Sequence, residues 1–446
     1  MASTLIKNAI IVNEGKSFPG AVVIENDKIA DILQDGAFDE NIFDNIVDAK
    51  GNFLIPGVID DHVHFRDPGL TYKADISTES RAAVAGGVTS YMDMPNTNPQ
   101  TTTIEALENK FLVAQENSIA NYSFYFGATN NNSNLLPSLD KRNICGIKLF
   151  MGSSTGNMLV DRRDALNKIF KNANMIIAAH CEEQSIISKN SAFYKKYFGE
   201  DVDIKYHPLI RSEEACYRSS SLAIELARET DAKLHILHLT TEKELSLLEN
   251  RALEDKQITA EVCIAHLLYS DEDYKRLGSL VKCNPAIKSI NDRNALRAAI
   301  ATDLIDVIAT DHAPHLLSEK EGGAFKATSG MPMIQFSLLA MMKLEKEGII
   351  SIEEIVKKMC HNPAKLYNIE KRGFIRKGYK ADLVIVNSNS AHKIKQKDIL
   401  SKCGWSPLNG ETLSSKVEKT FVNGNLVYSN NTIIEGSLGE HLTFAR

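Results

Sequence analysis

The sequence predicts an α/β fold: a (β/α)8 TIM-like barrel with a small β-rich domain formed by both chain termini. Two observations predict it. Residues 1–55 and the far end of the chain alternate apolar and polar side chains, which is typical of half-buried strands. Between them, short apolar segments alternate with helix-like segments, as in a barrel of parallel strands with helical crossovers.

Both ends of the chain carry the period-2 pattern, in "TLIKNAIIVNEG" and "AVVIENDKIADI" and again in "ADLVIVNS" and "KVEKTFVNGNLVYSNN". The pair Asn423-Gly424 lies between two apolar runs and predicts a hairpin turn. We therefore expect a small β-sandwich-like domain from residues 1–55 plus 366–446, with the barrel at 56–365 inserted into it.

The middle of the chain contains eight strand-like segments. The alternative arrangement for them is an open doubly wound sheet. They lie at 58–65, 89–95, 121–129, 144–150, 174–180, 233–240, 258–266 and 306–312.

Composition excludes some classes of protein. The 446 residues carry a net charge of -6, and no basic run indicates a nucleic-acid surface. No apolar run approaches the roughly 20 residues of a membrane span, and the N-terminus has no apolar core typical of a signal peptide. The seven cysteines include no CxxC pair, which indicates reduced cytoplasmic thiols and argues against a sulfur-ligated zinc.

Six polar residues lie at or near the ends of the predicted strands, where barrel enzymes place their catalytic groups. Each has a simpler interpretation on its own, such as a hydrogen-bonded core histidine, but their common location favours a metal site. Of His235 and His238 we expect His238, nearer the barrel mouth, to face the site. The six are His62, His64, Lys148, His180, His238 and Asp311.

Lys148 is unusual in this set, because a protonated lysine has no lone pair for a metal. An ion pair with an acidic neighbour is the simpler interpretation. However, four imidazoles and one carboxylate bring only one negative charge to two divalent ions. A buried lysine with a lowered pKa that reacts with carbon dioxide would supply a further anion.

Five segments together resemble the dihydroorotases of the amidohydrolase superfamily. They are "DDHVHFRDPG", "AGGVTSYMDMPNTNP", "GIKLFMGSSTG", "ATDHAPH" and "SGMPMIQFSL". The tail "HNPAKLYNIEKRGFIRKGYKADLVIVN" is similar to the superfamily's return into its β domain. The resemblance implies the reversible hydrolysis of L-dihydroorotate to N-carbamoyl-L-aspartate, in pyrimidine biosynthesis, by a hydroxide that bridges two metal ions.

The resemblance also implies a role for each site residue. His62, His64 and Asp311 would bind the more buried ion, and His180 and His238 the second. Lys148 would be N-carboxylated and bridge the two ions, which zinc fits best. Asp311 would also act as general base and acid.

The resemblance places a second group of residues against the substrate. Arg66 and Asn96 would bind the substrate's carboxylate. Asn284 and His315 would make further contacts with the substrate, and the backbone near Gly330 would contact its pyrimidine ring. The loop 151–161 corresponds to a mobile loop of some relatives, where Ser153, Ser154 or Thr155 would contribute.

Arg66 discriminates between the enzymes that share the metal motif. Dihydropyrimidinases and hydantoinases act on substrates that need no carboxylate here, and allantoinases typically lack the arginine. These activities remain the alternatives, together with an inactive homologue that acts as a partner subunit. For assembly, we expect a homodimer, the common state of soluble oligomers.

Overall fold

The structure is a computed structural model that describes residues 3–34, 39–152 and 158–446. Among these residues, eight parallel strands form one sheet whose order follows the sequence. They are β6 (Val58–Val63), β7 (Val88–Asp93), β8 (Asn121–Gly127), β9 (Gly146–Phe150), β10 (Ile177–His180), β11 (Leu234–Ile236), β12 (Ile258–Cys263) and β13 (Val307–Ala309).

The first and last strands of this sheet meet and close it. A parallel bridge joins Val63 to His312, and the backbone N–H of His64 donates to the His312 carbonyl at 2.7 Å. The strands β6 to β10 are buried along their whole length, as expected for parallel strands covered on both faces. The predicted (β/α)8 barrel is confirmed, and each strand overlaps the segment predicted for it.

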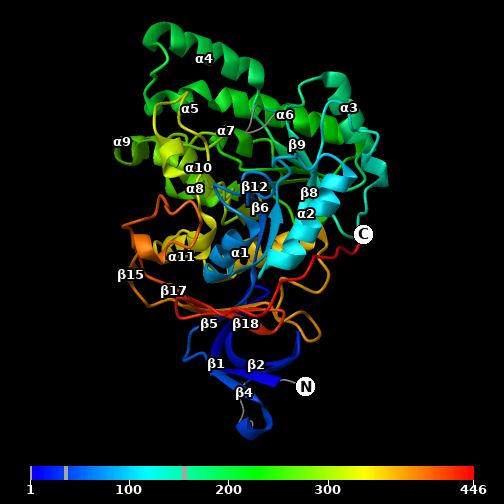
Figure 1. Ribbon diagram of the computed structural model, residues 1–446, viewed down its shortest axis with the longest axis vertical. Coiled ribbons are helices and arrows are strands. Elements are labelled where there is room, and N and C mark those ends of the chain that lie inside the picture. The colour runs from blue at the N-terminus through cyan, green and yellow to red at the C-terminus, as the bar shows by residue number, and fades with distance from the viewer. Residues whose placement is uncertain (1–2, 35–38, 153–157) are drawn as a thin grey trace.

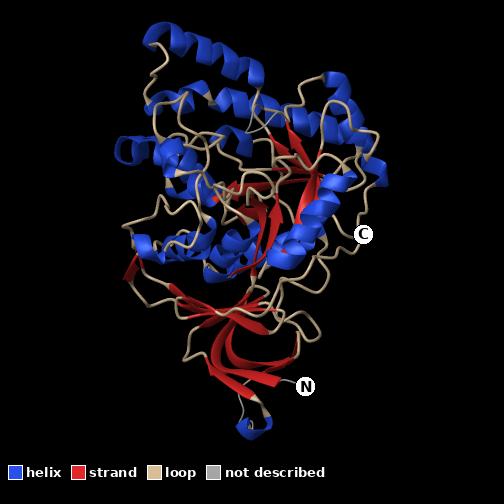
Figure 2. Cartoon of the chain, in the orientation of Figure 1, coloured by secondary structure: helices blue, strands red, loops and turns tan. Residues whose placement is uncertain are grey.

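Helices surround this sheet (Figure 2). Several of them begin at a side-chain cap; for example, the Ser212 side chain accepts from the N–H of Ala215 at the start of α6. The described residues form α1 (Ile76–Ala85), α2 (Ile104–Asn117), α3 (Arg163–Asn172), α4 (Gln184–Phe198), α5 (His207–Ile210), α6 (Glu213–Thr230), α7 (Glu242–Leu245), α8 (Ile264–Leu268), α9 (Tyr274–Leu277), α10 (Ile290–Ala299), α11 (Ser337–Lys346), α12 (Ile352–Val356) and α13 (Asn362–Tyr367).

A second sheet combines strands from both ends of the chain and lies below the barrel in Figure 1. Its order is β19-β18-β17-β14-β5-β1-β2-β3, with β4 paired to β1. The bounds are β1 (Ser3–Asn13), β2 (Lys16–Glu25), β3 (Lys28–Leu33), β4 (Asn45–Asp48), β5 (Phe53–Pro56), β14 (Leu383–Asn387), β17 (Lys416–Val422), β18 (Asn425–Ser429) and β19 (Thr432–Ile433).

Two features of this terminal sheet bear on the sequence predictions. The predicted turn at Asn423-Gly424 is confirmed, since both residues have positive φ between β17 and β18. The domain boundaries stay a prediction. The last residues return to the barrel (Figure 1), where Tyr122 exchanges backbone hydrogen bonds with Glu440 and Leu442 at 3.0 and 2.8 Å.

Two smaller features complete the fold. A separate pair of short strands, β15 (His392–Lys393) and β16 (Thr412–Leu413), lies outside both sheets. None of the helices that the structure describes combines the length and apolar character needed to cross a membrane.

Candidate active site

A small cavity opens at the carboxyl ends of the barrel strands. Every residue of the predicted site except His315 lines it. The predicted contributions of Ser153, Ser154 and Thr155 lie outside the described residues. The lining consists of His62, His64, Arg66, Asn96, Lys148, Phe150, His180, His238, Asn284, Asp311, Ala313, Ser329 and Gly330.

One half of the cavity floor joins the ends of β6 and β13. The carboxylate Oδ1 of Asp311 lies 3.3 Å from Nε2 of His62 and 3.0 Å from Nε2 of His64. Burial alone would raise the pKa of Asp311, but His62, His64 and Lys148 lower it to about 2. These three ligand atoms converge as a metal site requires, with an anion already among them.

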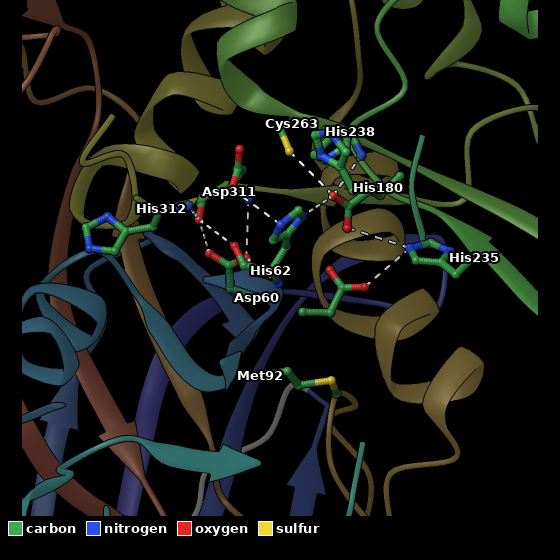
Figure 3. Close-up of polar contacts among 12 residues, drawn as sticks. Asp60, His62, Met92, His180, His235, His238, Cys263, Asp311 and His312 are labelled. Atoms are coloured by element: carbon green, nitrogen blue, oxygen red, sulfur yellow. Dashed lines mark hydrogen bonds and ion pairs between the residues drawn. The ribbon is translucent and has the colours of Figure 1, made fainter. Parts of the chain in front are cut away.

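The other half is formed by the ends of β10 and β11. Nδ1 of His180 and Nε2 of His238 face each other at 2.9 Å (Figure 3). Burial lowers the pKa of both imidazoles, and for His238 the neighbouring His180 and His62 lower it further. Both rings are therefore neutral and carry lone pairs for a cation. In Figure 3, His62 lies between this pair and Asp311.

Lys148 lies on β9, on the cavity lining. Its side chain is buried, and Nζ lies 4.6 Å from the centre of the Phe150 ring. It forms no ion pair within the described part of the chain, so the simpler interpretation of its role finds no support there. Burial is the main reason why its pKa falls to about 8. At that pKa roughly a tenth of the amine is neutral at pH 7, far more than for an exposed lysine.

Buried acceptors behind the histidines orient the rings, and sequence reasoning missed two of them. Nδ1 of His62 donates to Glu261 at 2.6 Å and Nε2 of His180 donates to Glu182 at 3.0 Å. Nδ1 of His64 contacts Oδ1 of Asn96 at 2.7 Å. Such partners fix the tautomer of a metal-binding histidine and leave its other nitrogen free for the ion.

His235 and Asp61 form the layer below the cavity. Nε2 of His235 lies 3.5 Å from Asp61 and 3.7 Å from Glu261 (Figure 3). Burial alone would lower the pKa of His235, but the two carboxylates raise it to about 9. The expectation that His238 rather than His235 faces the cavity agrees with this placement. His235 instead provides a buried positive charge beside Glu261.

The opposite side of the cavity offers groups that suit an organic anion. Arg66 is buried, and its Nε donates to the Pro314 carbonyl at 3.0 Å. The buried Oδ1 of Asn284 has no hydrogen-bond partner within the described chain, so it can accept from a ligand. The Gly330 N–H donates to the Lys282 carbonyl at 2.9 Å and the Gly330 carbonyl accepts from Nζ of Lys320 at 2.9 Å, so both of its backbone groups already have partners.

His315 lies one layer behind the cavity. Its Nε2 is 3.1 Å from Nη2 of Arg66 and 3.1 Å from the Ser329 carbonyl. In this conformation the side chain is therefore in contact with Arg66, and its predicted contact with the substrate remains a prediction.

The backbone adopts left-handed geometry at three of the predicted residues. Arg66 has φ 67°, His238 has φ 39° and Asp311 has φ 47°. Non-glycine residues rarely adopt this region, and such positions cluster where function requires a particular side-chain direction. At Asp311, the adjacent Thr310 donates its hydroxyl to Asp60 at 2.6 Å, which ties the turn to β6.

Comparisons with known proteins identify the family. The model of the amidohydrolase family matches residues 53–427. A dihydroorotase of Methanosarcina acetivorans is 32% identical over 91% of this chain and 88% of its own length. One from Lactobacillus johnsonii is 30% identical over 96% of this chain and all of its own length. The chain belongs to the dihydroorotase family of amidohydrolases. It is accordingly a hydrolase that acts on a cyclic amide.

Solved structures support the fold. An L-hydantoinase (dihydropyrimidinase) from Arthrobacter aurescens has a TM-score of 0.93 at 25% identity and covers 99% of this chain and all of its own. A dihydropyrimidinase from Brevibacillus agri has a TM-score of 0.89 at 22% identity, with full coverage of both chains. These neighbours share the barrel with an attached β sheet, whereas the sequence relatives bear the dihydroorotase name.

Proposed function

We propose that this chain interconverts L-dihydroorotate and N-carbamoyl-L-aspartate, with the roles of its cavity residues as the sequence predicts. The buried Arg66 guanidinium carries the proposal. It lies on the same cavity as the His–Asp cluster, so a substrate held by its carboxylate would present a ring amide to that cluster. A planar guanidinium binds a carboxylate through two parallel hydrogen bonds, which orient as well as attract it.

The ligand set fits two divalent ions. His62, His64 and Asp311 would hold one ion, His180 and His238 would hold the second, and nitrogen and carboxylate ligands suit zinc. The short distances between lone-pair atoms of neighbouring residues support this assignment, since each is relieved when a cation lies between them. Such ions would polarise the amide carbonyl and lower the pKa of the attacking water.

We propose that Lys148 is N-carboxylated. The neutral amine is the form that reacts with carbon dioxide, and the lowered pKa of Lys148 makes that form available. The product would be an anion on β9, on the same cavity as the two histidine groups. It would supply the negative charge that His180 and His238 lack.

Asp311 would move the proton in the hydrolytic direction. Its carboxylate would take a proton from the attacking water as the new C–O bond forms. It would then give that proton to the ring nitrogen as the C–N bond breaks. The low pKa of Asp311 keeps the carboxylate in its basic form when the reaction begins.

The test is turnover by purified, zinc-supplemented protein of L-dihydroorotate, dihydrouracil and allantoin, beside the variant Arg66→Ala. We expect turnover of dihydroorotate, with kcat/KM in the variant lower by about 100-fold or more, because a charged hydrogen-bonding partner is lost. Turnover of dihydrouracil or allantoin instead would retain the metal site and overturn the substrate. If metal-loaded protein turned over none of the three compounds, the result would favour the alternative that the chain is an inactive homologue.

The compartment and the oligomeric state of the protein are separate proposals. All seven cysteines are free and buried, which supports a reducing compartment such as the cytoplasm. A homodimer remains our proposal for its assembly, and sedimentation velocity would test it.

A further inference from the structure

One wall of the cavity is a segment of irregular backbone, residues 327–330, here called the wall segment. It contributes Ser329 and Gly330 to the cavity lining and belongs to no helix or strand. Gly330 has φ 142°, and a Cβ atom there would lie 2.6 Å from the carbonyl oxygen of Ala313. The wall segment therefore packs closely against the barrel without regular structure of its own.

All four carbonyl groups of the wall segment accept hydrogen bonds from buried side chains. The contacts are Lys282 Nζ to Ala327, Lys320 Nζ to Thr328 at 2.8 Å, His315 Nε2 to Ser329 at 3.1 Å and Lys320 Nζ to Gly330 at 2.9 Å. Side chains thus supply the contacts that a helix or a sheet would otherwise give this backbone. Two of the four come from one amino group, that of Lys320.

Lys320 also joins the wall segment to a second part of the cavity. Its Nζ donates to the Lys282 carbonyl at 3.0 Å, and the Gly330 N–H donates to the same carbonyl at 2.9 Å. Lys282 precedes Asn284, which lines the cavity, by two residues. An ammonium group has three protons, so Lys320 can serve all three of its carbonyl partners at once.

The surroundings of Lys320 suit a group that holds backbone. The residue is 2% exposed and forms no ion pair within the part of the chain that the structure describes. Burial lowers its pKa to about 7, whereas three carbonyl oxygens around Nζ stabilise the ammonium form. Burying an ammonium is costly unless it is hydrogen-bonded, and here those hydrogen bonds go to the walls of the cavity.

With its carbonyls occupied, the wall segment can offer a ligand only donors from its backbone. The Gly330 N–H is occupied as well. The N–H and the hydroxyl of Ser329 have no partner among the described residues, and Ser329 is a half-buried residue of the cavity lining. Both groups can donate to a carbonyl oxygen of a bound ring.

We propose that Lys320 is a positioning residue for substrate binding: its hydrogen bonds to the wall segment hold Ser329 where it can donate to a ring carbonyl of the substrate. The inference rests on the proposed function and extends it to a residue that does not touch the substrate. A donor contributes to binding only when it is held in place, and a misplacement of about 1 Å is already costly.

The first measurement is steady-state kinetics with L-dihydroorotate for zinc-supplemented wild type, Lys320→Met and Lys320→Gln. We expect Lys320→Met to raise KM roughly tenfold with kcat nearly unchanged, because a misplaced donor weakens binding of the ring without touching the reacting amide. Glutamine matches methionine in length but carries an amide with two donor protons. Lys320→Gln should therefore recover part of the lost affinity.

Lys358 provides a matched control. It is also a buried lysine, and its Nζ donates to the carbonyls of Thr302 and Ile305 at 2.8 and 2.6 Å. None of these three residues lines the cavity. Lys358→Met should leave KM unchanged.

The second measurement is amide hydrogen exchange, followed by mass spectrometry on peptides that contain the wall segment. We expect faster exchange there in Lys320→Met than in the wild type, and no change in Lys358→Met. Zinc content should be equal in all variants, because the hydrogen bonds of Lys320 go to backbone carbonyls and not to a proposed metal ligand.

Circular dichroism melting checks that each variant folds. If Lys320→Met does not fold, Lys282→Met makes the same test, since it removes the donor to the Ala327 carbonyl at the other end of the wall segment. KM should then rise in the same direction by a smaller factor.

The outcomes separate this inference from the proposed function. Turnover of dihydroorotate with an unchanged KM in Lys320→Met overturns the role of Lys320 alone. A raised KM without faster exchange of the wall segment, or an equal rise of KM in Lys358→Met, overturns it as well. A wild type that is inactive on dihydroorotate overturns the proposed function, and the role of Lys320 in binding that substrate with it.

Discussion

The two halves of the histidine cluster differ in how completely the protein itself supplies them. His62 and His64 both contact the Asp311 carboxylate. At His62, burial alone would lower the imidazole pKa, but Glu261 and Asp311 raise it. Nδ1 of His180 and Nε2 of His238 face each other without a carboxylate between them, and Nδ1 of His238 has no hydrogen-bond partner within the described chain. The first half therefore offers a metal ion two imidazoles and a carboxylate. The second half offers it two neutral imidazoles alone.

This difference supports the proposed role of Lys148. A cation in the second half would meet two imidazoles and no carboxylate of its own. Glu182 is close to His180, but its Oε2 contacts the far nitrogen of that ring and Arg211, and Glu182 is not on the cavity lining. A carboxylated Lys148 would give the second half the charge that Asp311 gives the first.

The largest expected effect follows from removing the anion of the first half. Asp311→Asn keeps the size of the side chain but cannot take a proton from water. We expect kcat to fall by roughly 10²–10⁴-fold while KM changes little. Kinetics together with metal analysis would check this, since a variant that lost its metal would mimic the effect. A rise in KM with kcat unchanged would instead assign Asp311 to substrate binding.

A smaller effect is expected from the buried glutamates, one for each half. Glu261→Gln should weaken the ion of the first half and Glu182→Gln that of the second, each by roughly 10–100-fold in affinity. Titration of metal-free protein with zinc, followed by calorimetry, measures both steps.

A matched control for the glutamates is Asp306→Asn. Asp306 is likewise a buried carboxylate, paired with Lys256 at 2.7 Å, and it lies outside the cavity lining. Its substitution should leave both zinc affinities unchanged. If Glu261→Gln and Glu182→Gln affected the same binding step, the separation into two halves would be wrong.

The mildest effect is a dependence on pH. Only the neutral amine of Lys148 reacts with carbon dioxide, and its pKa is about 8. Carboxylation should therefore accelerate as the pH rises from about 6 to about 8 and level off above that value. The carbamate signal of metal-free protein held under a constant pressure of 13CO2 would follow the reaction, because the concentration of dissolved CO2 then stays the same at every pH. Lys148→Met should show no signal, and a rate independent of pH would contradict the lowered pKa.

The sequence was sufficient for the barrel, because its strands are continuous apolar runs separated by helical patterns. It was also sufficient to propose the ligands, because His62, His180 and Asp311 lie at or beyond the ends of such runs. Glu261 could not be found in this way. It is a polar residue inside a strand, and it meets His62 from a position 199 residues away. Only closure of the barrel brings the two together.

The placement of His315 shows a second limit. Its motif indicates that it belongs to the site, yet its ring nitrogens contact Lys73 and Arg66 rather than the cavity. The partner Lys73 lies 242 residues away, near a loop with no regular pattern. Hydrogen-bond networks of this kind depend on individual side-chain directions, and sequence periodicity does not report them.

The terminal sheet has a consequence for the synthesis of the protein. Strand β5 pairs on one side with β1 and on the other with β14, which the ribosome makes only after the whole barrel. At roughly 5–20 residues per second, that partner arrives about 15–70 s later. During this interval the apolar edge of β5 has no neighbour, and unpaired edges promote aggregation. Nascent chains of this protein therefore have an early segment for chaperones to protect.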